Sequence, residues 1–232
     1  MWLEGAEPKE LNQLPEVLKR IESVRQFRLK SDAASTRKIA AMPSLFRDRN
    51  RFTSCIVVPR VSSENRPYIP CGFFGQNSIV SDTCMSVPNG KLYHFGILMS
   101  TMHMTWVRAV CGRLEMRYRY SKDVVYNNFP WPEKPTEKQI NKIENAAQKV
   151  LEARELFPNS SFADLYNPLT MPEPLVKAHN ELDKAVDLAY RSQPFTSETN
   201  RMEFLFWLYE QYLNAIFALD KPKKHKTNLV QM

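Results

Sequence analysis

The hydrophobic and polar positions of this 232-residue chain change their period part-way along the sequence. Between about residues 52 and 135, short apolar or β-branched runs are separated by Pro, Gly, Asn and Ser, which is typical of strands joined by turns. Beyond residue 136 the apolar positions recur every three or four residues, which is typical of amphipathic helices. The pattern therefore predicts an α+β chain: a mixed or antiparallel-strand domain at residues 1–135, a small helical bundle at 136–220 and a basic, disordered tail at 221–232.

In the first half, four runs are bounded by turn residues and predict strands: residues 53–59, 67–74, 77–88 and 91–98. Asn89-Gly90 lies between the last two runs and predicts a hairpin turn. A helix is expected over Ser100–Val110, in which His103 is a packed structural side chain. Another helix is expected within residues 9–30, with Pro15 in its first turn.

Three amphipathic helices are expected in the second half, after a linker at residues 133–139. Thr136 and Gln139 have the spacing of a capping box at the start of the first helix. The other two helices follow Pro172 and include Met202, respectively. Ahead of the linker, Phe129 and Trp131 are expected to hold the junction between the two halves.

One segment, residues 113–120, alternates charged and apolar side chains. The pattern predicts a single strand with its charged side chains on one face, because successive residues of a strand point to opposite faces; these charged residues are Arg113, Glu115, Arg117 and Arg119. Arg can bind the O6 and N7 atoms of guanine, and Glu can accept from the N4 amine of cytosine. The residues leave two interpretations open, a base-reading face or an edge strand with cross-strand ion pairs. The run DVVYNNF that follows predicts a second strand.

The net charge of +7 is unevenly distributed along the sequence. Residues 1–135 carry a net charge of +8, whereas residues 136–232 carry −1. This asymmetry favours a first half that faces a polyanion. Basic side chains on and after the N-terminal helix are candidates for phosphate contacts, with a merely solvated helix face as the alternative; they are Arg25, Arg28, Lys38, Arg47 and Arg49.

No motif for catalysis is found in the sequence. It contains no GxGxxG, P-loop, HExxH or GxSxG motif and no His/Cys cluster with metal-ligand spacing. The four cysteines are widely spaced, as expected for buried thiols of a cytoplasmic protein. No apolar run approaches the roughly 20 residues that span a membrane. The residues alone therefore predict a binding module.

Several longer segments resemble the carboxyl-terminal third of MmeI-like type IIL restriction–modification enzymes. They are RPYIPCGFF, LYHFGIL, MHMTWVRAVCGRLEMRYRYS, VVYNNFPWP and ADLYNPLTMP, and the resemblance covers the chain from about Leu14 to Tyr209. Enzymes of this family combine an endonuclease, an S-adenosylmethionine-dependent adenine-N6 methyltransferase and a target recognition domain in one polypeptide. The resemblance implies that residues 1–135 form the target recognition domain and residues 136–220 the helical C-terminal domain.

The resemblance also implies roles for particular residues. Glu115 and Arg117 match two positions of the GRLxxxYRYS segment that are associated with the identity of one base pair, and the Glu/Arg combination is expected to favour cytosine in the methylated strand. Arg119 matches a further recognition position, and the segment around Thr83 matches another. Arg113 is expected to assist.

The family's cofactor-binding glycine loop, its Asn-Pro-Pro-Tyr motif and its nuclease residues have no counterpart in this sequence. We therefore expect a DNA sequence-recognition module that positions double-stranded DNA for a catalytic domain of the same polypeptide or complex. S-adenosylmethionine and a divalent metal would belong to that catalytic part, and this chain would bind neither. The alternative is a structural or protein-interaction domain without base readout.

Overall fold

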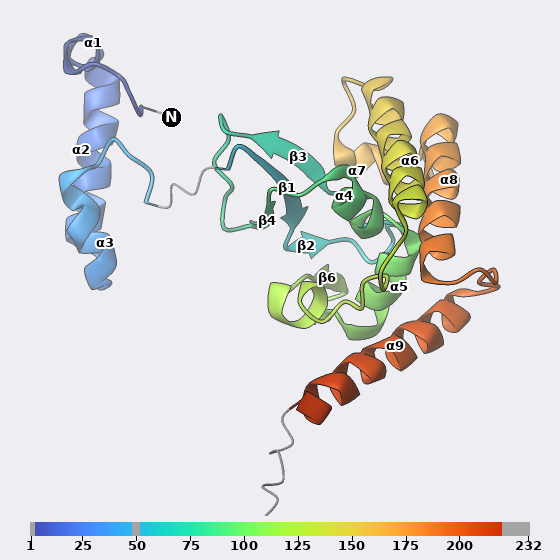
Figure 1. Ribbon diagram of the computed structural model, residues 1–232. Coiled ribbons are helices and arrows are strands. Elements are labelled where there is room, and N and C mark those ends of the chain that lie inside the picture. Colours follow the sequence, from blue (N-terminus) through green and yellow to red (C-terminus); the bar gives the residue numbers. More distant parts are fainter. Residues whose placement is uncertain (1–2, 48–51, 220–232) are drawn as a thin grey trace, which may run out of the picture. The chain divides into compact units, whose positions relative to one another are not determined.

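The computed structural model of the chain describes residues 3–47 and 52–219. The chain divides into two compact units, residues 1–51 and residues 52–232 (Figure 1). None of the helices in the described ranges is long and apolar enough to cross a membrane.

The first unit is helical. It contains α1 (Pro8–Asn12), α2 (Pro15–Leu29), α3 (Ala34–Lys38) and the 3₁₀ turn η1 (Ile39–Ala41). The single helix expected at residues 9–30 is thus two helices, because Pro15 lacks the N–H that would continue α1 and is instead favoured at the first position of α2. Among the residues described in this unit, only Arg28 and Ala40 are buried.

The second unit begins with two small antiparallel sheets, in agreement with the predicted α+β class. One sheet has the order β3-β1-β4, and the other has the order β2-β6-β5. The strands are β1 (Ser54–Pro59), β2 (Val61–Ser62), β3 (Gly72–Gly75), β4 (Cys84–Pro88), β5 (Gly112–Leu114) and β6 (Arg117–Arg119). Only Arg60 separates β1 from β2, so the chain passes from one sheet to the other at this residue.

Two predicted strands are helical instead. Residues 91–98 form helix α4 (Leu92–Leu98), and no hairpin is made at Asn89-Gly90, although Asn89 has the positive φ of 55° that favours Asn or Gly. The segment after Tyr120 forms a π-helical turn, η2 (Lys122–Tyr126). Short apolar runs are compatible with either a buried strand or a buried helix, so period alone does not separate the two.

Four of the remaining five helices were predicted, and the short helix α7 was not. They are α5 (Thr101–Val110), α6 (Glu137–Glu155), α7 (Phe162–Leu165), α8 (Glu173–Tyr190) and α9 (Glu198–Leu219). The capping box that begins α6 is confirmed, because Gln139 N–H donates to Thr136 Oγ1 at 3.3 Å and Thr136 N–H donates to Gln139 Oε1 at 2.9 Å. Helix α6 packs along α8 and against α4, and α9 packs against α5.

The hydrophobic core of the second unit is continuous across residue 135. Buried side chains from β1, α4 and α5 form one cluster with buried side chains of α6 and α8; examples are Ile56, Phe95, Trp106, Ile143 and Leu182. Helices α4 and α6 approach closely at Gly96. A Cβ at this position would lie only 2.7 Å from a methyl group of Ile143, so the packing requires glycine. The sheets are therefore built on the same core as the helices that follow them.

A half-buried carboxylate on α8 fixes the start of α5. Asp183 accepts hydrogen bonds from Thr101 N–H at 2.6 Å, from the Thr101 hydroxyl and from Tyr68 Oη at 2.8 Å. An acidic group at a helix N-terminus is favourable because the first N–H groups have no partner within the helix. The carboxylate thus joins α8 to α5 and to the loop that carries Tyr68.

Candidate nucleic-acid interface

The charged segment at residues 113–120 is a β-hairpin and not the single strand that was predicted. Strands β5 and β6 pair antiparallel, with Leu114 opposite Arg117, so Glu115 and Met116 form the turn between them. Glu115 has a φ of 56°, in the left-handed region that is costly for residues other than Gly, Asn and Asp. The sequence has no Gly or Asn at this turn, so the alternation of charged and apolar residues predicts a continuous strand where the chain in fact turns.

The turn changes which side chains share a face. Arg113 lies opposite Tyr118, and residues directly opposite in an antiparallel pair share a face of the sheet. The Arg113 guanidinium lies 4.0 Å from the centre of the Tyr118 ring and donates to Met116 O at 3.2 Å. Arg117 and Arg119 are on the other face. The predicted row of four charged side chains on one face is therefore wrong, because Arg113 supports the hairpin from the opposite side.

Glu115 and Arg117 lie together at the exposed end of the hairpin. Arg117 Nη2 donates to Glu115 Oε2 at 2.8 Å, while the Glu115 and Arg117 side chains remain 76% and 48% exposed. An exposed ion pair contributes little to stability, so exchanging it for other polar partners costs little. Met116, between them, is 70% exposed. The end of the hairpin thus presents a carboxylate, a guanidinium and a flexible apolar side chain to the solvent.

A groove of about 930 Å³ lies beside the hairpin and contains two more of the predicted recognition residues, Thr83 and Arg119. The charged residues that line it are Arg60 and Arg119, and its lining contains no Asp or Glu. The backbone of Arg60 connects the two sides, because Arg60 N–H donates to Thr83 O at 3.0 Å and Tyr120 N–H donates to Arg60 O at 2.8 Å. Segments far apart in the sequence therefore form one basic groove.

Arg60 was not identified as a candidate from the sequence. It stands alone between two β-branched runs, and only its position between strands of different sheets brings it to the groove. No local pattern in the sequence could have signalled this role.

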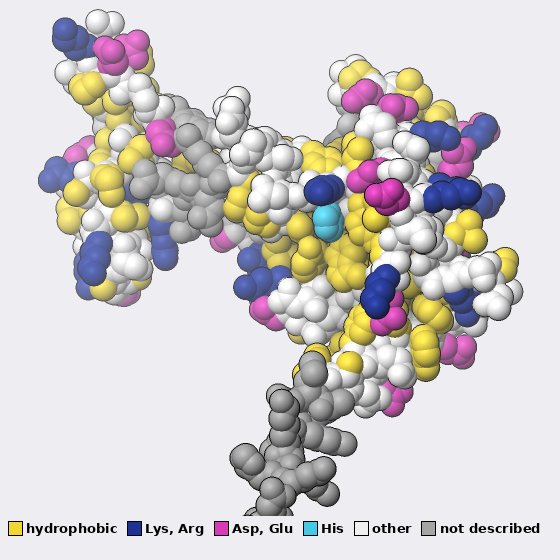
Figure 2. Space-filling view, viewed as in Figure 1, with side chains coloured by type: hydrophobic (Ala, Val, Ile, Leu, Met, Phe, Trp, Pro, Cys, Tyr) yellow, Lys and Arg dark blue, Asp and Glu magenta, His cyan; other side chains and the backbone are white. Residues whose placement is uncertain are grey.

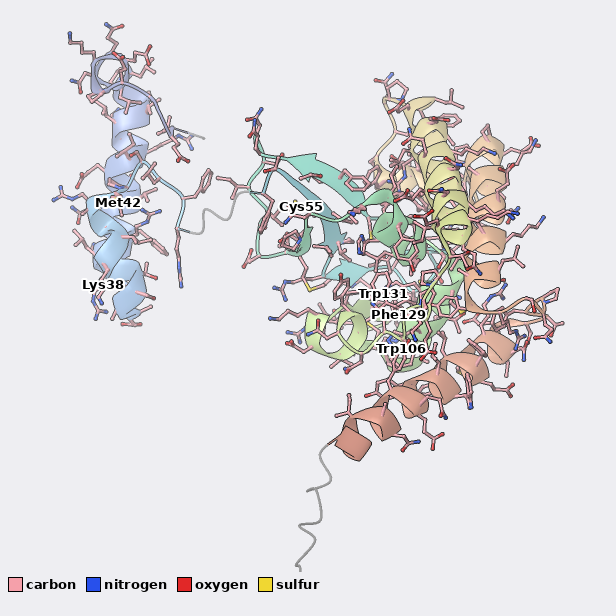
Figure 3. The ribbon with its side chains drawn as sticks, viewed as in Figure 1. Lys38, Met42, Cys55, Trp106, Phe129 and Trp131 are labelled. Carbon is pink, nitrogen blue, oxygen red and sulfur yellow. The ribbon has the colours of Figure 1, made fainter. Side chains whose placement is uncertain are left out.

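Buried aromatic and imidazole side chains pack around Tyr120, which is one of the residues that line the groove. His103 Nε2 and Tyr120 Oη are 2.9 Å apart, and Trp106 Nε1 donates to Val125 O at 3.0 Å, which ties η2 to α5. Phe129 packs between Trp106 and Trp131 beside α5 (Figure 3). The prediction that Phe129 and Trp131 hold the junction agrees with two further contacts from the second half of the chain: Tyr190 Oη donates to Pro130 O and Tyr212 Oη donates to Trp131 O.

The residues predicted to contact phosphates lie in the first unit, and the structure separates them into two kinds. Lys38 is exposed (Figure 3), Arg25 is half exposed with Glu22 at 3.6 Å, and Arg47 donates to Thr36 Oγ1 at 3.3 Å. Arg28 is buried and donates to three backbone carbonyl oxygens, so its guanidinium is committed to the fold of the unit. Arg49 lies outside the described residues.

The two buried histidines make stability dependent on pH. Burial lowers the pKa of both His103 and His179 from 6.5 to about 3, and the nearby Arg154 also lowers that of His179. The unfolded chain therefore binds more protons than the folded chain below pH 6.5, so the stability present above this pH is lost as the pH falls toward 3. We expect the free energy of unfolding in urea to fall by roughly 2 kcal/mol per histidine between about pH 7.5 and 5.

The matched variant for this measurement is His103→Gln, in which the fall in the free energy of unfolding with pH should be about half as large. A free energy of unfolding that stays constant over this pH range would contradict the prediction.

No catalytic arrangement is visible in the described ranges. They contain no group of three or more His, Cys, Asp or Glu side chains placed to hold a metal ion. The four cysteines are free thiols; Cys55, Cys71 and Cys111 are buried and Cys84 is half-buried. The chemistry that the surface offers is hydrogen bonding and charge pairing by the hairpin and groove.

Two family models match consecutive parts of the chain. Residues 1–133 match the target recognition domain of MmeI, and residues 135–217 match the MmeI C-terminal domain. The chain belongs to the MmeI family.

Two relatives of this MmeI-family chain show how much of the larger proteins it represents. DNA methyltransferase A of Bacillus subtilis (strain 168) is 44% identical over 212 residues, which is 91% of this chain and 24% of the relative. A solved structure of the type IIL restriction–modification enzyme MmeI in complex with DNA is 46% identical, with a TM-score of 0.81 over 92% of this chain and 28% of the solved chain. The chain thus spans about a quarter of the length of each relative.

Proposed function

We propose that this chain recognises a DNA sequence for a restriction–modification methyltransferase whose catalytic part lies outside it. The observation that carries the proposal is the hairpin beside the groove, where exposed Glu and Arg side chains stand next to a basic hollow lined without acids. Its relatives include a DNA methyltransferase and an enzyme solved in complex with DNA. Arg and Glu at the end of a two-stranded ribbon suit the major groove, which admits such a ribbon and presents distinct donors and acceptors for each base pair.

Within this proposal, Glu115 and Arg117 read base edges. Their ion pair is exchanged for the donors and acceptors of one G·C pair or of neighbouring pairs. Arg119 and Thr83 contribute from the groove, and we add Arg60, whose backbone positions both sides of it. Arg113 assists indirectly, because it holds the Met116 carbonyl and stacks on Tyr118.

Phosphate contacts would set the register of the module on the duplex without carrying sequence information. For this role we retain Arg25, Lys38, Arg47 and Arg49. We exclude Arg28, because three carbonyl oxygens of its own unit already accept from its guanidinium.

Methyl transfer is assigned to the catalytic part of the proposed enzyme. S-adenosylmethionine would supply the methyl group there, and a divalent metal would serve any nuclease. The residues of this chain do not fit either group: the sequence has neither the glycine loop nor the Asn-Pro-Pro-Tyr motif, and its described residues form no metal cluster. The role of this chain would be to place the DNA for a catalytic domain in the same polypeptide or complex.

Duplex DNA binding as a function of salt tests the proposal. Fluorescence anisotropy with a labelled duplex should show a logarithm of affinity that falls linearly with the logarithm of salt concentration, with a slope of about −0.9 per phosphate contacted. Lys38→Ala should reduce this slope by about 1 for any sequence. The same substitution at Lys149, on α6, is the control and should leave the slope unchanged. Absence of binding at low salt would contradict the proposal and favour a protein-interaction domain.

A further inference from the structure

A pocket of about 530 Å³ lies where the loop after β2 meets the loop between α7 and α8. Its polar lining residues are Ser63, Asn65, Arg66 and Asn167, and its lining contains no Asp or Glu. Asn167 belongs to the stretch that matches the MmeI C-terminal domain, whereas the other three belong to the stretch that matches the target recognition domain. Both domains therefore contribute to this pocket, and its lining carries one charge, that of Arg66.

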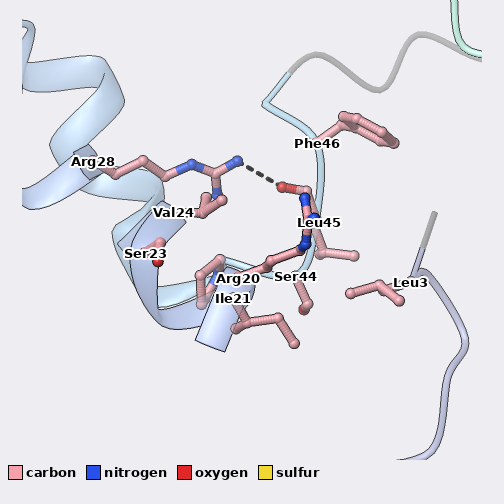
Figure 4. Close-up of a pocket in the computed structure, with 10 residues that line it drawn as sticks. Leu3, Arg20, Ile21, Ser23, Val24, Arg28, Ser44, Leu45 and Phe46 are labelled. Carbon is pink, nitrogen blue, oxygen red and sulfur yellow. Dashed lines mark hydrogen bonds between the residues drawn. The ribbon is translucent and has the colours of Figure 1, made fainter. Parts of the chain in front are cut away.

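The Arg66 guanidinium is held at one end and open at the other. Its Nη1 donates to the hydroxyl of Ser62 at 3.3 Å, and Ser62 is itself buried on β2. In the described ranges, neither a carboxylate nor a carbonyl oxygen accepts from its Nη2 or Nε. Arg28 in the first unit is the contrast, because its guanidinium donates to three carbonyl oxygens beside its own pocket (Figure 4). Arg66 thus retains the forked donors with which Arg binds phosphate.

The uncharged polar groups of the pocket present donors as well. Ser63 Oγ accepts from Asn65 N–H at 3.3 Å, so its hydroxyl hydrogen is left to donate. Asn167 Oδ1 accepts from Leu169 N–H at 3.0 Å, which leaves the NH₂ group of the Asn167 amide as a donor. A pocket that offers several donors around one cation suits an anion with several acceptor oxygens.

The two carboxylates nearest to the pocket in the sequence do not line it. Asp164 accepts from the N–H of Ser161 at 3.1 Å and from its hydroxyl at 2.6 Å, at the start of α7. Glu64 is half-buried and is not among the lining residues. The positive charge of Arg66 is therefore not balanced within the pocket, which favours an anionic ligand.

The register of β2 places the pocket next to the hairpin. Ser62 lies opposite Tyr118 on β6, so continuing the antiparallel register brings Ser63 toward Arg117. Val61, which precedes Ser62, lines the basic groove, whereas Ser63 lines the pocket. Figure 2 shows Lys and Arg side chains gathered beside the sheets of the second unit. The groove, the hairpin and the pocket are therefore neighbours along β2.

We propose that this pocket binds a backbone phosphate of the DNA whose bases are read by the hairpin. Free phosphate has the same chemistry, but the position beside the hairpin favours a phosphodiester of the same duplex. Pro168 and Leu169, the latter 91% exposed, form an apolar side of the pocket against which a deoxyribose can pack. This inference rests on the proposed function. It gives the helical C-terminal domain, through Asn167, a direct part in DNA binding.

Salt titrations of duplex binding by two variants test the inference. Arg66→Gln removes the charge and should reduce the salt slope by about 1 without altering the base preference. Asn167→Asp keeps an oxygen that accepts from Leu169 N–H, but it replaces the NH₂ group by a charged oxygen. It should weaken binding at low salt by about tenfold or more, because it brings like charges together. Asn180→Asp adds the same charge at an exposed position of α8 and should bind as the unsubstituted chain does.

A methylphosphonate scan identifies the phosphate that is bound. The duplex is one that the chain selects from a randomised library, and single linkages are made uncharged in turn. One such linkage should weaken binding by the unsubstituted chain and have no further effect on Arg66→Gln, because both changes remove the same contact. Circular dichroism during thermal unfolding verifies that each variant is folded.

Three outcomes would overturn the inference while leaving the proposed function in place. The first is duplex binding in which both variants keep the slope and affinity of the unsubstituted chain. The second is a changed base preference for Arg66→Gln, which would make Arg66 a base reader. The third is calorimetric binding of inorganic phosphate that Asn167→Asp abolishes while duplex binding is unaffected, which would assign the pocket to a free anion. Absence of duplex binding by the unsubstituted chain would overturn both proposals.

Discussion

Exchanging the charges at the end of the hairpin, Glu115→Lys together with Arg117→Asp, is expected to change the preferred base pair at one position of the recognition sequence. Lys can donate to O6 and N7 of guanine, whereas Glu accepts from the N4 amine of cytosine. Asp accepts hydrogen bonds where Arg donates them, so the base preferred on the opposite strand changes as well. Each good contact discriminates by about 1–3 kcal/mol, so the preference should move from cytosine toward guanine by a factor of at least ten. Selection from a randomised duplex library by the chain, followed by sequencing, measures the preference directly.

The structure makes this exchange a clean one. At position 115, where φ is 56°, Lys has the same backbone strain as Glu, and the double exchange leaves the net charge unchanged. The control is the equivalent exchange of the Lys149–Glu181 pair, which is also exposed and 2.6 Å apart but lies on α6 and α8. An unchanged base preference in the hairpin variant, with duplex binding retained, would remove Glu115 and Arg117 from the proposed base readers. Arg117→Ala alone should relax the preference at that one position.

Of the single substitutions that we propose, Asp183→Ala should lower the free energy of unfolding most. The variant leaves Thr101 N–H and the Tyr68 hydroxyl without their acceptor in a half-buried site, and each unsatisfied group costs about 1–3 kcal/mol. We therefore expect the free energy of unfolding in urea to fall by roughly 2–5 kcal/mol. Burial raises the pKa of Asp183, while the hydrogen bonds from Thr101 and Tyr68 lower it, so the hydrogen bonds favour the ionised form that the variant removes.

Glu181→Ala is the control for this measurement. Glu181 lies two residues earlier on α8 and pairs with Lys149 at the surface, so its loss should change the free energy of unfolding by less than about 1 kcal/mol. Equal effects of the two substitutions would show that Asp183 does not join α8 to α5 in the way that we describe.

The helical half was predictable because its signals are local. Thr136 and Gln139 begin α6 as a capping box, and the apolar period of α8 and α9 runs over several turns. The run at residues 91–98 forms a helix where the pattern predicts a strand. Residues 95–98 are buried in the core beside α5, α6 and α8, and a helix buried in this way lacks the polar face that marks helical period.

The candidate site was predictable only in part. The types of residue at the hairpin, and their nearness in sequence, indicated hydrogen bonding to bases. Their arrangement depended on a turn at Glu115 that lacks Gly or Asn, and this turn moved Arg113 to the other face. The environment of Arg28 was not predictable for a related reason. Residues 39–45 return to the helix and supply the three carbonyl oxygens that accept from its guanidinium, and no local pattern signals this return.

The two backbone hydrogen bonds of Arg60 determine which segments must be exchanged together when the proposed recognition surface of one family member is grafted onto another. The backbone of Arg60 is hydrogen-bonded both to the Thr83 carbonyl and to the Tyr120 amide. The proposed recognition surface is therefore built from three separate segments of the sequence. A graft of residues 112–120 alone would place a foreign hairpin against a resident loop, with side chains from two different specificities in one groove. The smallest coherent cassette therefore comprises residues 59–62, 83–84 and 112–124, exchanged together.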